Sequence, residues 1–185
     1  MQKIMFSDKF GLTQAVIDGR KTMTRRFVGK VWLNDDGSIY EHSPSSYKIG
    51  EVVAVAQSYS SCIDDILSKI AYTEDKSAMR GKLEKSKGWN NKMFVRADLM
   101  PYRIKITNIR TERLHDISDD DCLKEGVLIA DRDCEPFYIA DNYGKPLYGW
   151  FDNPREVFSF LIDKVSGCGT WDRNPWVFVY EFELE

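Results

Sequence analysis

The spacing of apolar residues predicts a mixture of strands and short helices. Short apolar runs predict strands at residues 3–6 and 51–59. Alternating apolar and polar positions predict strands at residues 101–114 and 176–184, the former with an irregularity where the period slips. Apolar residues at helical spacing predict helices at residues 8–19, 118–126 and 153–167, each with a capping residue before it and a glycine at its end. These elements lack regular βαβ spacing. We therefore expect an α+β fold, a small mixed β-barrel of about five to seven strands with short flanking helices.

Composition bounds the class of protein. The chain has 185 residues, of which 43% are apolar and 30% charged, which is typical of a globular domain with one sizeable core. Its formal charge of -3 argues against tight binding of long duplex nucleic acid through phosphate neutralisation alone. Four irregularly spaced cysteines and two histidines give no zinc or disulfide pattern, so we expect no metal and no cofactor. The first residues lack signal-peptide features and no apolar run is long enough to span a bilayer, so we expect a cytoplasmic protein without membrane contact.

A basic segment follows the predicted end of the first helix. After Gly19 the chain reads Arg20, Lys21, Thr22, Met23, Thr24, Arg25 and Arg26. A glycine in the left-handed conformation would reverse the chain here and present the following side chains from a fixed turn. This segment is the first candidate for chemistry. The alternative is that its cations protect an exposed strand at the edge of the barrel.

Several motifs in the chain occur in the same order in one family. Gly19, Lys21 and Arg26 have the spacing GxKxxxxR, and further matches are Tyr47-Lys48-Ile49-Gly50-Glu51, Arg113-Leu114-His115-Asp116-Ile117-Ser118, Lys124-Glu125-Gly126 and Asn174-Pro175-Trp176-Val177. In these motifs the chain resembles phage-related and bacterial ASCH domains, which are members of the PUA-like superfamily of small β-barrels. The resemblance covers most of a single domain over residues 1–185 and leaves out insertions at about residues 60–92 and 127–150.

The resemblance implies a nucleoside or single-stranded RNA as the partner. Small members with a Lys-Thr-x-Thr-x-Arg segment are amidohydrolases of N4-acetylcytidine and related acylated nucleosides, in which a lysine, a threonine and a glutamate are catalytic. These residues match Lys21, Thr24 and Glu125. This chain departs from those small enzymes in two ways: Arg25 stands where they have an apolar residue, and the chain is much longer than theirs. The alternative is a non-enzymatic, RNA-binding or phage-associated accessory module.

Amide hydrolysis is chemically consistent with these side chains. Thr24 would supply a hydroxyl, and Lys21 would act as a base if burial or neighbouring arginines lowered its pKa. Glu125 falls in the last turn of its predicted helix, where the helix dipole opposes a carboxylate, and this favours a role other than stability. In an ideal strand, however, Lys21 and Thr24 would point to opposite faces, so the site requires Lys21 to lie in the preceding turn.

Further side chains are candidates for binding a nucleoside or RNA. Cations near the basic segment and aromatic residues near the last strand suit phosphates and bases, and they are Arg20, Arg25, Arg26, Arg103, Trp171 and Trp176. Packing of the tryptophans in the core and a half-exposed strand carrying Arg103 explain these residues equally well. If the protein is an enzyme, we expect Lys21, Thr24 and Glu125 to lie within hydrogen-bonding distance of one another. If it is a binding module, we expect a continuous basic face on its surface.

Overall fold

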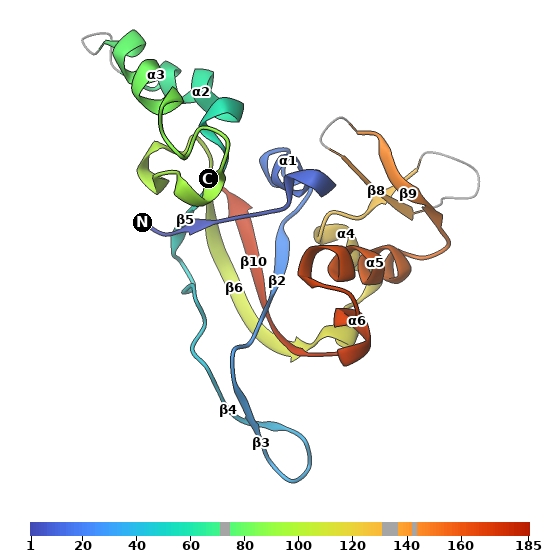
Figure 1. Cartoon of the computed structure of the whole chain (residues 1–185). Helices are drawn as coiled ribbons and strands as arrows, with labels where there is room; N and C mark the ends of the chain where they lie inside the picture. Colours follow the sequence, from blue (N-terminus) through green and yellow to red (C-terminus); the bar gives the residue numbers. More distant parts are fainter. Residues whose placement is uncertain (71–74, 131–136, 142–143) are drawn as a thin grey trace. The chain divides into compact units, whose positions relative to one another are not determined.

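The computed structural model of the protein describes residues 1–70, 75–130, 137–141 and 144–185. The chain divides into two compact units (Figure 1). Unit 1 consists of Met1–Phe6, Val52–Lys105 and Leu184–Glu185, and unit 2 consists of Ser7–Glu51 and Ile106–Glu183. Each unit is therefore assembled from segments that are far apart in the sequence.

Unit 1 combines a small sheet with two helices. Strand β1 (Lys3–Ile4) runs parallel to β5 (Val52–Val55), and β5 pairs in antiparallel register with the start of β6 (Arg103–Arg113), so that Val53 lies opposite Ile104. The segment between β5 and β6 forms α2 (Tyr59–Ser68), α3 (Lys76–Glu84) and the 3-10 turns η2 (Lys92–Phe94) and η3 (Ala97–Leu99).

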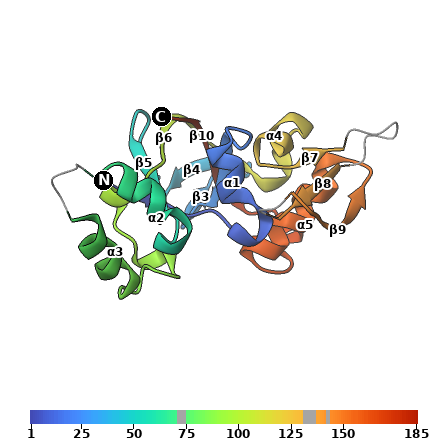
Figure 2. The ribbon, with the colours of Figure 1, turned by 90° about the horizontal axis from the view of Figure 1, so that it is seen from above.

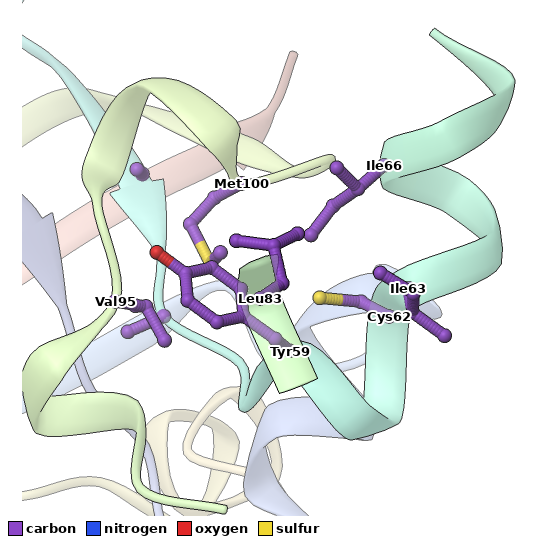
Figure 3. Packing of buried hydrophobic residues seen from close by; sticks show 9 residues of the cluster. Tyr59, Cys62, Ile63, Ile66, Leu83, Val95 and Met100 are labelled. Atoms are coloured by element: carbon purple, nitrogen blue, oxygen red, sulfur yellow. The ribbon is translucent and has the colours of Figure 1, made fainter. Parts of the chain in front are cut away.

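A hydrophobic cluster lies at the centre of unit 1. Side chains from α2, α3 and the segment after α3 point toward one another in Figure 3, where the sulfur of Met100 lies beside the ring of Tyr59. The buried members are Ala54, Ala56, Tyr59, Cys62, Ile63, Ile66, Leu83, Val95 and Met100. The region expected to be an insertion at residues 60–92 thus supplies much of the core of unit 1.

The main sheet of unit 2 has the strand order β6-β10-β2. Strand β10 (Trp176–Leu184) is antiparallel to β2 (Met23–Phe27), with Tyr180 opposite Thr24 and Val179 opposite Arg25. Residues Val177–Tyr180 of β10 are all buried, as expected for a strand covered on both faces.

Short helices accompany this sheet in unit 2. They are η1 (Asp8–Phe10), α1 (Leu12–Ile17), η4 (Leu114–Asp116), α4 (Asp119–Lys124), α5 (Pro154–Ser166) and α6 (Thr170–Arg173). Helix α5 begins as its sequence predicts: Asn153 accepts a hydrogen bond from Glu156 N, and proline occupies the first helical position. Figure 2 shows α5 beside β8 (Phe137–Ala140) and β9 (Pro146–Phe151), which it contacts.

Two further strand groups extend unit 2. Strands β3 (Val31–Leu33) and β4 (Ile39–His42) form an antiparallel hairpin, which the turn-rich residues between β2 and β5 suggest. Strand β7 (Leu128–Ile129) pairs with β8, and β8 pairs with β9. This three-stranded sheet falls in the second expected insertion, of which residues 131–136 and 142–143 lie outside the described part.

The expected α+β class is confirmed, and two details differ. The described residues form ten strands rather than five to seven, because the hairpin and the second insertion form sheets of their own. The strand expected at residues 51–59 ends at Val55, and Tyr59 instead begins α2. A closed barrel and a single domain with two insertions stay predictions. None of the described helices combines the length and the apolar composition needed to cross a bilayer.

Candidate active site

The backbone places Lys21 between the ends of two helices of unit 2. Gly19 has a φ of +72°, so the chain turns after α1, and Lys21 precedes β2. Lys21 N donates a hydrogen bond to Ala15 O at 2.9 Å, and Thr22 N donates to Lys124 O at 3.0 Å. Lys21 therefore lies in the turn and next to the end of α4, where Glu125 is the C-terminal cap.

The ammonium group of Lys21 is buried and fully hydrogen-bonded. Its Nζ donates to Met23 O at 2.7 Å, to Glu125 O at 2.8 Å and to Glu125 Oε2 at 2.5 Å. Lys21 is only 2% exposed and Glu125 4%. An ammonium group has three protons, so each of them has an acceptor in this arrangement.

Burial lowers the pKa of Lys21 from its ordinary value. The loss of hydration disfavours the charged amine, and the positive charges of Arg26 and Arg25 act in the same direction. The carboxylate of Glu125 opposes this shift through its charge and its hydrogen bond. The amine thus loses its proton more easily than an exposed lysine does, and Glu125 is placed to receive that proton.

Glu125 is also bound by Arg25. Arg25 Nη1 donates to Glu125 Oε1 at 3.2 Å, so the carboxylate lies between two cations. The same guanidinium donates through Nη2 to Glu112 Oε1 at 2.7 Å and to Asp121 Oδ2 at 2.9 Å. The side chain of Arg25 is 1% exposed. Arg25 is therefore an internal cation shared by three carboxylates.

Arg110 extends these contacts along strand β6. It donates through Nη2 to Asp121 Oδ2 at 2.5 Å, through Nε to Glu112 Oε2 at 2.9 Å, and through Nη1 to Glu181 Oε1. We call the resulting set the charged network, and its members are Lys21, Arg25, Arg110, Glu112, Asp121, Glu125 and Glu181. Arg25 and Arg110 are thus engaged with carboxylates, which differs from the basic face that a binding module predicts.

Thr24 lies on the other face of β2. Alternation along the strand separates Thr24 and Arg26 from Met23 and Arg25, and Thr24 is opposite Tyr180 on β10. Thr24 is 5% exposed, and its hydroxyl makes no hydrogen bond within the described part of the chain. The structure thus brings Lys21 and Glu125 together, while the contacts of the described residues do not join Thr24 to that pair.

Aromatic and polar groups surround the Thr24 face. The hydroxyl of Tyr180 is hydrogen-bonded to Ser45 Oγ at 2.9 Å, and the ring of Tyr47 meets that of Tyr180 edge-on at 5.3 Å between centroids. Burial raises the pKa of Tyr47, and the charge of the exposed Arg26 opposes this shift. This face therefore combines a cation, a hydroxyl and aromatic rings, which suit a polar aromatic ligand.

The other arginine candidates occupy exposed positions. Arg20 is exposed, forms an ion pair with Asp18 at 3.0 Å, and lines a cavity of about 170 Å³ together with Ala15 and Gly126. Arg103 is exposed at the start of β6, in the part of that strand that belongs to unit 1.

The two tryptophan candidates have different surroundings. Trp171 is half-buried, its ring centroid is 4.4 Å from that of His115, and it lines a hollow of about 530 Å³ together with Phe151 and Phe160. Trp176 is covered by Arg113, whose guanidinium lies 4.6 Å from the ring centroid. Its Nε1 is buried without a hydrogen-bond partner in the described part. Trp171 is thus the tryptophan next to open space.

A Lys21→Met variant tests the direction of the lysine pKa. The pKa of Lys21 is lowered from 10.5 in the folded protein. At a pH between the folded and the unfolded pKa, Lys21 is therefore protonated more often in the unfolded chain. The free energy of unfolding must rise with pH in that range. We expect the stability difference between wild type and variant to increase in urea denaturation as the pH approaches 10.5. A difference that falls with pH would mean that Glu125 instead raises the pKa.

Comparison with known proteins gives a similarity to a solved structure. No known family model matches the chain, and no curated protein matches it. One solved structure is similar to this chain, with 13% sequence identity and a TM-score of 0.40. The alignment covers 97% of this chain and 75% of the chain in that structure. It is an ASCH domain from Lactobacillus crispatus JV V101.

The motif through which the sequence resembles ASCH domains extends from the turn before β2 into the strand. Gly19 and Lys21 precede the strand, and Arg26 is its fourth residue. The described residues contain no group of three or more His, Cys, Asp or Glu side chains placed to hold a metal ion. Sequence reasoning did not find Glu112, Asp121 and Glu181 as partners of the arginines. The sequence held one indication of these partners. Alternation along β2 places Arg25 on the same buried face as Met23, and a buried cation needs carboxylate partners.

Proposed function

We propose that the protein is an ASCH-type domain of the PUA-like barrel class that hydrolyses the N4-acyl amide of an acylated cytidine, as a nucleoside or within single-stranded RNA. The buried ion pair of Lys21 and Glu125 carries this proposal. The two residues are 104 positions apart in the sequence, yet Nζ and Oε2 lie 2.5 Å apart. Both are residues that the motif resemblance assigns to catalysis, and a buried lysine with a lowered pKa beside a carboxylate is typical of catalytic sites.

The proposed chemistry uses the lowered pKa of Lys21. Glu125 accepts a proton from the ammonium, and the neutral amine then takes a proton from the water molecule that attacks the acyl carbon. Thr24, whose hydroxyl is not engaged by the described residues and lies on the other face of β2, is proposed to hydrogen-bond the substrate, and the attack of water releases the acyl group as a carboxylic acid, which then ionises. The proton taken up by Lys21 passes to the leaving cytosine amine. Arg26, exposed on the same face of β2, is proposed to contact the substrate.

Hydrolysis of N4-acetylcytidine by the purified protein tests this proposal. We expect cytidine and acetate as products, followed by liquid chromatography, and a loss of at least about 100-fold in rate for Lys21→Ala, Glu125→Gln and Thr24→Val. The matched control is Lys30→Ala, which removes an exposed lysine and should keep the wild-type rate. Absence of turnover by wild type, or equal turnover by Lys21→Ala, would contradict the enzymatic function.

Recognition without catalysis is the second candidate, and the burial of Lys21 favours it. All three ammonium protons are bound within the chain, so the amine reaches a substrate only if one of these bonds opens. A recognition module would bind cytidine or its acetylated form in calorimetry and release no acetate. In that case Lys21→Ala would change the stability of the protein more than its affinity.

A further inference from the structure

The segment that follows α2 is strongly basic, although the whole chain is acidic. Residues 76–96 contain seven lysines and arginines and a single carboxylate, Glu84, in a chain of formal charge -3. The cations are Lys76, Arg80, Lys82, Lys85, Lys87, Lys92 and Arg96. Unit 1 as a whole has eleven Lys and Arg against seven Asp and Glu, a formal charge of +4. This asymmetry indicates an anionic partner for unit 1.

Three of these lysines are exposed in one stretch of chain. Arg80 is paired with Asp64, and Arg96 with Asp98. Lys82, Lys85 and Lys87 are exposed, and none of them forms an ion pair with a carboxylate of the described residues. They lie in the last turn of α3 and directly after it, so their charges are close together along the chain.

An exposed aromatic ring lies beside the last of these lysines, Lys87. Phe94 is 56% exposed and the preceding Met93 is 62% exposed, whereas Val95, the next residue, is buried in the cluster of Figure 3. The Nζ of Lys87 lies 5.7 Å from the centroid of the Phe94 ring. This segment therefore combines exposed cations with an exposed aromatic ring.

The backbone around Phe94 is held in place by several contacts. Lys3 Nζ donates to Met93 O and Val95 O, each at 2.7 Å, and Asn91 Oδ1 accepts a hydrogen bond from Met93 N at 3.0 Å. Arg96 N donates to the hydroxyl of the buried Tyr59 at 2.9 Å. The exposed ring is thus presented by a fixed segment, which reduces the entropy lost when a ligand binds.

We propose that this surface of unit 1, formed by Lys82, Lys85, Lys87 and Phe94, binds single-stranded nucleic acid. Phe94 stacks on an unpaired base, and the lysines contact the phosphates on either side. A duplex offers the phosphates but no free base face, so the exposed ring favours a single strand. This inference shares with the proposed function only the class of ligand, a single-stranded nucleic acid. It places a second binding surface in unit 1, whereas Lys21 and Glu125 belong to unit 2.

Fluorescence anisotropy with a labelled single-stranded oligouridylate, and with its duplex, tests the surface. We expect Phe94→Ala to weaken binding of the single strand by roughly 5- to 150-fold, the usual range for one stacked base, with little effect on the duplex. Replacing Lys85 and Lys87 by glutamine should lower the salt dependence of log K by about 0.7 for each lost phosphate contact. The control is Lys30→Gln, the same change at an exposed lysine of unit 2.

Two results would overturn the inference. One is wild-type RNA affinity in Phe94→Ala and in the double lysine variant, and the other is equal preference for single strand and duplex. Hydrolysis of free N4-acetylcytidine, measured on the same variants, separates this outcome from failure of the proposed enzyme. Phe94→Ala should keep the wild-type rate on the nucleoside, and Lys30→Gln should keep both that rate and the wild-type affinity for the oligonucleotide.

Discussion

Replacement of Arg25 by alanine is expected to lower the free energy of unfolding by about 3–5 kcal/mol, as is usual when one partner of a buried ion pair is removed. The guanidinium binds Glu112, Asp121 and Glu125, and its side chain is 1% exposed. Without it these carboxylates lose a shared cation in a place that water reaches poorly. Urea denaturation of wild type and variant at neutral pH measures the effect.

The neighbouring arginine provides the control for this variant. Arg26 is exposed on the opposite face of β2, so Arg26→Ala should change the free energy of unfolding by no more than about 0.5 kcal/mol. Arg25→Lys keeps the positive charge but loses the forked geometry of the guanidinium. Its loss in free energy of unfolding should lie between those of Arg25→Ala and Arg26→Ala. Equal stability of Arg25→Ala and Arg26→Ala would show that the charged network contributes no net stability.

Replacement of Gly88 by alanine should destabilise unit 1 by about 1–3 kcal/mol, the usual cost of overpacking. A Cβ atom built at this position would lie 2.5 Å from Tyr59 Cε2 and 2.9 Å from Tyr59 Cδ2. Tyr59 is 2% exposed, and its hydroxyl is held by Arg96 N, so the ring cannot move away easily. Thermal unfolding followed by circular dichroism gives the measurement.

Gly81 is the matched control for this substitution. It lies inside α3, and a Cβ atom there would meet nothing within 4 Å. Gly81→Ala should therefore stabilise the protein by roughly 0.5–1 kcal/mol through the higher helix propensity of alanine. Destabilisation of both variants to the same extent would mean that the contact with Tyr59 is not the cause.

Helices with clear capping residues were predictable from the sequence. Ser118 caps α4 by accepting a hydrogen bond from Asp121 N, and Asn153 caps α5 in the same way from Glu156 N. These signals are local, so they can be read without knowing the rest of the fold. The first helix was less predictable, because Gly11 adopts a φ of +61° and divides it into η1 and α1.

The partners in the charged network could not be read from the sequence. Asp121 lies in the first turn of α4, where helix capping already explains an acidic residue, and Glu112 continues the alternation of a half-exposed strand. Only the tertiary fold places both beside Arg25. The family resemblance selected Lys21 and Glu125, but it gave no information on the arginine that Glu125 also binds.

The order of segments in unit 2 has a consequence for folding kinetics. Strand β2 lies near the start of the chain and pairs with β10, so that Met23 is opposite Glu181. The whole of Val52–Lys105, which belongs to unit 1, lies between them in the sequence. Bringing two strands together that are so far apart in the sequence costs chain entropy before their contacts form. We therefore expect slow refolding of this sheet. Until β10 pairs with it, β2 has no partner strand in this sheet, and association between chains during refolding should begin there.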